Sequence, residues 1–210
     1  GSPCTDVSSA ATLRPKDKVR GLQGDKSSLL TYFLEAIETF PAAHFILENV
    51  KSMTTRTKQE FTRVISAAAS GRPVYCNEID ACAFTGVHRK RIFWTSWPVG
   101  PVGDWKLGDA PPWTDALLPV EDVRDWAHTD RGVAYMNRTV KGGRTHWDFN
   151  FHQDSDRATG RTLTSNLHKG VPYNVLIDRR VDPPLIRKMV PEELEVMMGF
   201  PRGWTRTGAS

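Results

Sequence analysis

The chain has few cysteines: only Cys4, Cys76 and Cys82 occur among its 210 residues, and no two of them form a C-x-x-C pair. A structural zinc site of the usual kind needs paired cysteine or histidine ligands, and three cysteines leave one thiol over in any disulfide scheme. The sequence therefore favours neither a zinc ribbon nor a secreted disulfide framework, and we expect a reducing compartment.

Long apolar runs are also missing. No stretch approaches the roughly 20 residues needed to span a bilayer, and no basic segment followed by an apolar one opens the chain. We therefore expect no membrane partner and an intracellular location, in the cytoplasm or nucleoid or in a nucleus. With 39% hydrophobic and 25% charged residues, the chain can bury one substantial core and a small second lobe.

Hydrophobic periodicity predicts alternating helices and strands in the first half. Apolar residues recur at helical spacing between Leu29 and Phe40, with a serine at 27 or 28 as the cap and a proline after the run. The short apolar run 44–47 predicts a buried parallel strand that delivers Glu48 at its carboxyl end. A helix over 57–69 and strands over 73–79 and 91–97 complete the pattern of an α/β fold.

The pattern changes after residue 97. Proline and glycine become frequent and periodicity fades until about Arg161, which predicts an irregular lobe with short strands. Four tryptophans lie in this stretch; they could stack on bases, but tryptophan more often anchors a small core, and we favour that role. The run 191–198 predicts a helix, with a proline at an early position and Gly199 as its stop.

Three short strings carry side chains of chemical interest: GSPC at 1–4, FILENV at 45–50 and HRKRIFW at 88–94. They supply a thiol, a carboxylic acid and two guanidinium groups. A free thiol titrates near about 8.5, so a nucleophilic cysteine needs a cationic setting, and Arg89 and Arg91 are candidates to provide it. A lone cysteine is most often a small buried hydrophobe, but the accompanying acid and arginines favour covalent catalysis here.

These strings resemble, in order and spacing, the central motifs of the C5-cytosine DNA methyltransferase family. The RTLT string at 161–164, the run 191–194 and the MGFP string at 198–201 extend the resemblance, and HRKRIFW is most similar to animal de novo-type and phage members. The resemblance implies an α/β fold, namely the C-terminal part of a Rossmann-like methyltransferase sheet with a smaller, irregular target-recognition lobe. It implies a catalytic part over 1–97, a target-recognition lobe over 98–160 and a return segment over 161–210.

The resemblance also implies catalytic roles. The Cys4 thiolate would add to C6 of a flipped-out cytosine, Glu48 would face N3 of the ring, and Arg89 or Arg91 would contact the cytosine and support Glu48; which arginine does which stays open. A surface glutamate that caps a helix is the alternative for Glu48, and a solvated basic turn is the alternative for the arginines.

Further contacts with DNA are expected in two regions. The segment 5–26 has the composition of a mobile loop, and the resemblance implies that it closes over the DNA; a disordered surface loop is its alternative. Substrate-binding or DNA-binding roles are expected for the following residues, with a β-turn as an alternative for the last three: Pro3, Ser8, Asn49, Thr164, Asn166 and Lys169. Basic clusters at 14–26, 51–58, 89–91, 141–144 and 179–188 could contact phosphates, although such clusters are usually solvated surface.

S-adenosylmethionine is the cofactor that the resemblance implies, with double-stranded DNA as partner. The family's glycine-rich cofactor loop normally precedes the Pro-Cys dipeptide, and only three residues precede Cys4 here. We therefore expect the cofactor-binding residues mostly outside this chain, either because the sequence is a fragment or because a complementing chain carries them, and little methyl transfer by the chain alone. A non-catalytic DNA-binding remnant is the alternative, and a cysteine hydrolase is disfavoured because no histidine has a recognisable spacing to Cys4.

Overall fold

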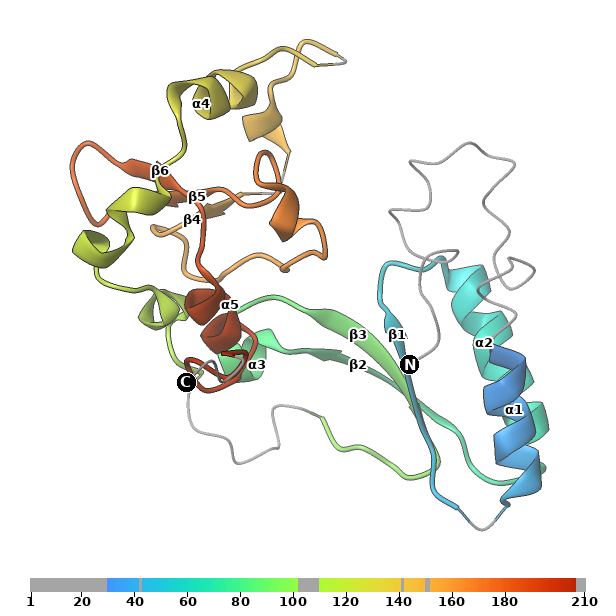
Figure 1. Cartoon of the computed structure of the whole chain (residues 1–210). Coiled ribbons are helices and arrows are strands. Elements are labelled where there is room, and N and C mark those ends of the chain that lie inside the picture. The colour runs from blue at the N-terminus through green and yellow to red at the C-terminus, as the bar shows by residue number, and fades with distance from the viewer. Residues whose placement is uncertain (1–29, 42, 102–109, 141, 150–151, 207–210) are drawn as a thin grey trace. The chain divides into compact units, whose positions relative to one another are not determined.

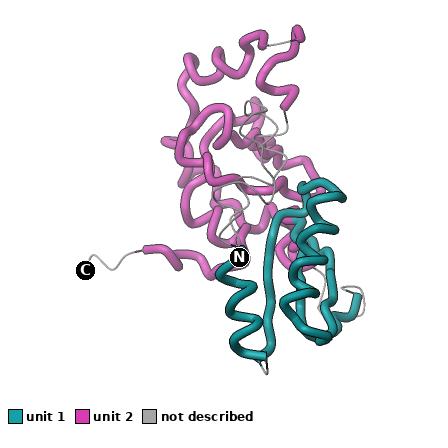
Figure 2. Tube along the Cα trace, turned by 90° about the vertical axis from the view of Figure 1, so that its right-hand side faces the viewer, with its two compact units in different colours: residues 1–80, 90–106 teal, residues 81–89, 107–210 magenta. Residues whose placement is uncertain are grey.

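The computed structural model of the chain describes residues 30–41, 43–101, 110–140, 142–149 and 152–206 (Figure 1). The chain divides into two compact units. Residues 1–80 and 90–106 form the first unit, and residues 81–89 and 107–210 form the second (Figure 2). This division follows compactness, so the functional assignment of 98–160 as a target-recognition lobe stays a prediction.

The first unit contains two helices and a three-stranded sheet. Its elements are α1 (Leu30–Thr39), β1 (Ile46–Val50), α2 (Thr55–Ala68), β2 (Tyr75–Asp80) and β3 (Lys90–Thr95). The helices expected at 29–40 and 57–69 and the strands expected at 73–79 and 91–97 are thus confirmed to within a few residues. The side chain of Thr54 starts α2 by accepting a hydrogen bond from the backbone N–H of Thr57 at 3.1 Å.

The sheet has the order β1-β3-β2, and β3 runs antiparallel to both of its neighbours. The parallel strand expected at 44–47 is therefore wrong in two respects. The strand begins at Ile46 and holds Glu48 at its middle, and it pairs antiparallel with β3. A buried apolar run gives no information on the direction of a neighbour that lies far along the chain, so the pattern could not decide the pairing.

The core of the first unit lies between the sheet and the two helices, which pack on the same face of the sheet in Figure 1. Leu47 and Trp94 project from the sheet toward this core and are 3% and 0% exposed. The ring of Phe61 stacks on Trp94 at 5.4 Å, and the indole N–H of Trp94 donates to the hydroxyl of Thr62 at 2.8 Å. Because side chains alternate along a strand, Glu48 and its neighbours two residues away face the other side of the sheet.

The second unit is built mainly from short elements. They are α3 (Cys82–Thr85), η6 (Trp113–Ala116), η7 (Val120–Trp126), α4 (Asp130–Met136), η8 (His146–Asp148), β4 (Gln153–Asp154), η9 (Leu167–Lys169), β5 (Leu176–Asp178), β6 (Leu185–Arg187) and α5 (Pro191–Met197), where η marks a 3-10 helix. Its sheet has the order β4-β5-β6, with β4 parallel and β6 antiparallel to β5. The irregular stretch is therefore richer in short helices than in the strands we expected.

The second unit has its own core, which includes Trp113 at 1% exposure. The indole N–H of Trp113 donates to the carbonyl of Arg157 at 2.8 Å, so this tryptophan is a core anchor, as expected. The helix expected at 191–198 is confirmed as α5, which begins at Pro191 and is followed by Gly199 with a left-handed φ of 86°. Within the described ranges, no helix combines the length and the apolar character that crossing a membrane requires.

Candidate active site

The site begins with an ion pair that the sheet register creates. Val50 of β1 lies opposite Arg91 of β3, and Glu48 lies two residues before Val50 on the same face. Diagonal cross-strand neighbours of this kind are within reach of long side chains. The Nε atom of Arg91 is 2.6 Å from Oε1 of Glu48, so the structure brings together two of the four expected catalytic residues.

The two partners differ in exposure. The side chain of Arg91 is 17% exposed and that of Glu48 is 37% exposed. The buried Nε of Arg91 forms no hydrogen bond because its N–H does not point at the carboxylate oxygen, so the close contact is an ion pair. Nη1 of Arg91 donates to the backbone carbonyl of Lys90 at 2.9 Å, which fixes the guanidinium along its own strand. Arg91 can therefore hold the carboxyl group in position while Glu48 remains accessible to a ligand.

Asn49 lies on the opposite face of the sheet from Glu48. It is 1% exposed, and its Oδ1 accepts a hydrogen bond from the backbone N–H of Val50 at 2.7 Å. This hydrogen bond orients the end of β1, and the substrate-binding role expected for Asn49 stays a prediction. The structure does not place this side chain with Glu48 and Arg91, so a direct substrate contact is not supported by its position.

Arg89 and His88 belong to the second unit, just before β3. The backbone carbonyl of Arg89 accepts a hydrogen bond from Ala81 at 3.3 Å, and the arginine side chain is half-buried. The Nε2 atom of His88 is 3.1 Å from the hydroxyl of Thr159, and its carbonyl accepts a hydrogen bond from Thr162 at 2.6 Å. These contacts fasten the RTLT string to the HRKR string.

The anchor of the RTLT string is thus Thr162, which the sequence reasoning missed. Thr164, for which we expected a substrate-binding or DNA-binding role, is exposed, and its carbonyl accepts a hydrogen bond from the backbone N–H of Leu167 at 3.3 Å, in a turn of the kind considered as its alternative. A threonine is a common surface residue, so only the pairing with His88 in three dimensions singles out Thr162.

Asn166 and Lys169 frame η9 in the second unit. The carbonyl of Asn166 accepts a hydrogen bond from the backbone N–H of Lys169 at 2.9 Å, and the side chain of Lys169 is exposed. This geometry agrees with the turn that we considered as an alternative, and it leaves the lysine ammonium at the surface. Pro3, Cys4 and Ser8 lie outside the described residues.

A metal centre is not found among the described residues. No group of three or more histidine, cysteine, aspartate or glutamate residues that could hold an ion occurs among them. They also do not by themselves fit S-adenosylmethionine, because neither β1 nor β2 leads into a glycine-rich turn: β1 is followed by Lys51–Thr54 and β2 by Ala81 and α3. We therefore assign no described residue to that cofactor.

Comparison with known proteins agrees with the resemblance of the motifs. Residues 1–97, which include Cys4, Glu48, Arg89 and Arg91, match the family model of the C-5 cytosine-specific DNA methylases. No curated protein matches the chain.

Two solved structures share the fold. The S. pombe Dnmt2 methyltransferase is 14% identical with a TM-score of 0.59, over 90% of this chain and 67% of that one. The Entamoeba histolytica methyltransferase EhMeth is 12% identical with a TM-score of 0.63, over 99% of this chain and 66% of that one. The chain thus spans about two thirds of the length of each neighbour and has the α/β fold of methyltransferases. Residues 1–97 of this chain are thus similar to the C-5 cytosine-specific DNA methylases, and the chain shares the fold of the two methyltransferases.

Proposed function

We propose that this chain carries the catalytic centre of a DNA (cytosine-5-)-methyltransferase that modifies a cytosine flipped out of duplex DNA. The observation that supports this proposal best is the Glu48–Arg91 ion pair at 2.6 Å on one face of the sheet. A carboxyl group that is positioned by a guanidinium and still accessible is suited to the N3 position of a pyrimidine. The family match covers the range that contains Cys4, and this supports Cys4 as the nucleophile.

In the proposed reaction, Sγ of Cys4 forms a bond to C6 of the cytosine. The electron pair of the C5–C6 double bond shifts, Glu48 holds a proton at N3, and C5 becomes nucleophilic. S-adenosylmethionine, when bound, supplies the methyl group that C5 receives. Loss of the C5 proton then restores the double bond and breaks the bond between Sγ and C6, which frees the enzyme. Covalent addition replaces one difficult step by easier ones.

Arg91 is a positioning residue in this scheme. Its side chain touches Glu48, and its anchorage to the Lys90 carbonyl keeps that contact in place. A lysine would keep the charge but lose the planar fork of donors, so lysine at this position is not an equivalent replacement. Arg89 is proposed to contribute positive charge near the substrate, and the DNA contacts of Ser8, Asn166 and Lys169 also remain proposals.

Covalent trapping tests the function. A duplex with 5-fluorocytosine at the target, labelled S-adenosylmethionine, this chain and the segment that precedes the Pro-Cys motif in family members should give a denaturation-resistant complex. Cys4→Ala should abolish that complex and keep duplex binding, whereas Cys82→Ser, which removes a thiol from α3, should leave it intact. Glu48→Gln should lower methyl transfer by about 10²–10⁴-fold, the usual contribution of a general acid.

Two results would contradict the proposal. A Cys4→Ala variant that still forms the covalent complex would remove Cys4 from the chemistry. Duplex binding without any methyl transfer in the mixture would instead support the non-catalytic DNA-binding alternative.

A further inference from the structure

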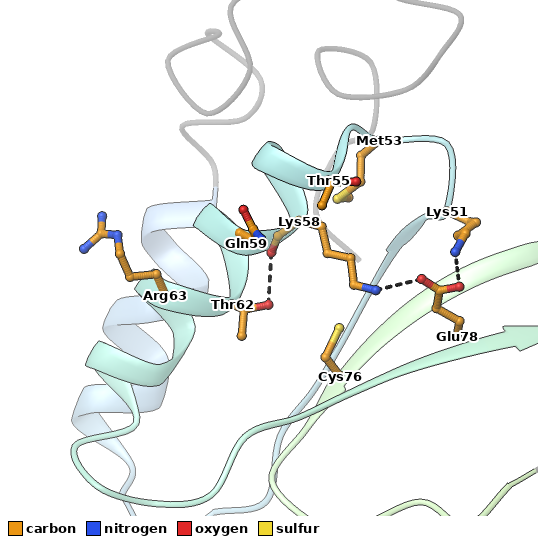
Figure 3. Close-up of a pocket in the computed structure, with 9 residues that line it drawn as sticks. All are labelled: Lys51, Met53, Thr55, Lys58, Gln59, Thr62, Arg63, Cys76 and Glu78. Atoms are coloured by element: carbon orange, nitrogen blue, oxygen red, sulfur yellow. Dashed lines mark hydrogen bonds and ion pairs between the residues drawn. The ribbon is translucent and has the colours of Figure 1, made fainter.

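The first unit contains a cavity of about 630 Å³ beside α2, away from the Glu48–Arg91 pair (Figure 3). It lies on the face of the sheet that α2 covers, because Glu78 and Cys76 of β2 stand opposite Ile92 and Trp94, whose side chains belong to the helix-facing core. The residues that line it are Lys51, Met53, Thr55, Lys58, Gln59, Thr62, Arg63, Cys76 and Glu78.

Two ammonium groups in this cavity share one carboxylate. Lys58 Nζ is 2.7 Å from Oε1 of Glu78, and Lys51 forms an ion pair with the other oxygen. Figure 3 shows both lysines directed at Glu78 from two different segments, whereas Arg63 lies at the outer edge with its guanidinium turned away. Arg63 has its own partner, Glu60. The lysine–glutamate trio therefore carries one positive charge in excess.

The contact between Lys58 and Glu78 favours the charged form of both groups. Hydrogen bonds from Lys51 and Lys58 lower the pKa of Glu78, and the hydrogen bond to Glu78 raises the pKa of Lys58. The excess charge is thus a property of the folded protein over the physiological range.

The first turn of α2 adds to the positive potential. It contains Arg56 and Lys58 and no acidic residue, although a helix N-terminus carries a partial positive charge that favours anions. Cations at this end weaken the helix unless something compensates for them. Within the cavity, only Glu78 does so among the lining residues, and it serves two lysines.

Other residues that line the cavity are apolar or weakly polar. Met53 is 7% exposed, and the Cys76 thiol is half-buried, which raises the pKa of Cys76 above its usual range. The hydroxyl of Thr62, which also lines the cavity, donates to the Lys58 carbonyl at 3.0 Å. A ligand with an anionic group and an attached apolar or aromatic part would match both kinds of lining residue.

We propose that this cavity is a binding site for a phosphate group, in which Lys51 and Lys58 turn from Glu78 to the phosphate oxygens. The nucleoside attached to the phosphate would lie along Met53 and Cys76. Either a free nucleotide or the backbone of a nucleic acid can present this chemistry. The inference does not depend on the methyl transfer proposed for Glu48, because none of the lining residues takes part in that reaction.

Isothermal titration calorimetry with the whole chain tests the site, using deoxycytidine 5′-monophosphate, deoxycytidine and a short DNA duplex as probes. Lys58→Gln should weaken mononucleotide binding about tenfold, the effect of one charge-assisted hydrogen bond, and deoxycytidine should not bind. Glu78→Gln should strengthen binding severalfold because both lysines lose their competing partner. A misfolded variant cannot bind more tightly than the wild type. The gain of affinity in Glu78→Gln therefore shows that the weaker binding of Lys58→Gln is not caused by a general loss of folding.

Two controls carry the same changes of charge away from the cavity. Glu38→Gln at an exposed position of α1 and Arg206→Gln, whose side chain is 77% exposed, should leave the affinity unchanged. If Lys58→Gln weakens binding and Glu78→Gln strengthens it with the duplex alone, the site binds a nucleic-acid backbone. If the two variants change the affinity for the mononucleotide in this way, the site binds a free nucleotide. Equal effects of Lys58→Gln and Arg206→Gln on the affinity, or no effect of either cavity variant on any probe, would overturn the proposal.

Discussion

Arg187 in β6 is a fully buried charged residue. Its side chain and those of Asp178 and Glu193 are all 0% exposed. Its Nε donates to Asp178 at 3.0 Å, and its two terminal nitrogens donate to Glu193 at 2.8 and 2.7 Å. Glu193 also accepts the backbone N–H of Leu118 at 2.9 Å, so one satisfied network joins β5, β6, α5 and the segment before η7. Removing one member of such a network destabilises the fold, because it leaves a buried charge without its partner.

The network makes a prediction for Asp178→Asn. The variant leaves Arg187 with one carboxylate fewer in a buried site, and we expect the free energy of unfolding to fall by about 3–5 kcal/mol at neutral pH. Burial alone would raise the pKa of Asp178, but the donors of Arg180 and Arg187 outweigh it and lower that pKa. The carboxylate therefore stabilises the fold above about pH 4, the ordinary range of aspartate, and this stabilisation is lost as the pH falls through the lowered pKa.

Urea denaturation at several pH values measures this effect. The difference between the wild type and Asp178→Asn should be full near pH 7 and should shrink below about pH 4. Asp156→Asn is a matched control, because the side chain of Asp156 is 72% exposed in its contact with Arg179. A difference that stays constant with pH, or an equal loss in the control, would contradict the assignment.

At the scale of elements, α3 ends at a glycine that no other residue can replace without strain. Gly86 has a left-handed φ of 68°, and a Cβ atom there would lie 2.6 Å from the carbonyl oxygen of Pro111 and 2.9 Å from the backbone nitrogen of Trp113. Backbone atoms cannot move aside as a flexible side chain can. Gly71 has a similar φ of 85°, but nothing lies within 4 Å of its Cβ position.

A comparison of alanine variants at these two glycines separates the cost of backbone strain, which both share, from the cost of a steric clash, which only Gly86 has. Gly71→Ala should lower the free energy of unfolding by about 1 kcal/mol, the cost of a left-handed conformation for alanine. Gly86→Ala should lower the free energy of unfolding clearly more. It carries the same backbone strain, and the segment at 111–113 must also shift to make room for the new methyl group. Thermal unfolding of the two variants gives the comparison, and equal losses would show that the segment at 111–113 adapts freely.

The helices and strands of the first unit were largely predictable, because their signals are local. The spacing of apolar residues marked α1 and α2, and Pro191 with Gly199 marked both ends of α5. The direction of β1 was not predictable, since it depends on pairing with β3, which follows far along the chain. The short elements between 110 and 187 gave little periodic signal because each is too brief to show one.

The candidate site was predictable as a set of residue types but not as a geometry. The motifs singled out Glu48 and Arg91 and left open which arginine supports the acid. The register of β1 and β3 gives that place to Arg91, because Val50 stands opposite it. Likewise, the role of Thr162 depends on its contact with His88, which no local pattern contains.

At the scale of the whole molecule, two separate hydrophobic clusters of buried residues stabilise the described part of the chain. One cluster, which includes Ile65, lies in the first unit, and the other, which includes Leu176, lies in the second. Both residues are 0% exposed, so Ile65→Ala and Leu176→Ala each create a cavity and should cost about 2–5 kcal/mol in their own unit. Chains with more than one core often depart from two-state unfolding.

We therefore expect differential scanning calorimetry to resolve two transitions, each lowered by only one of the two variants. The reason is that a cavity in one core removes contacts from that core alone, and the other unit keeps its own buried cluster. Hydrogen exchange gives an independent reading, since amides of α2 should lose protection in Ile65→Ala and amides of β5 in Leu176→Ala. A single transition that both variants lower equally would show that the two units unfold as one cooperative body, and the division into two cores would then have no thermodynamic meaning.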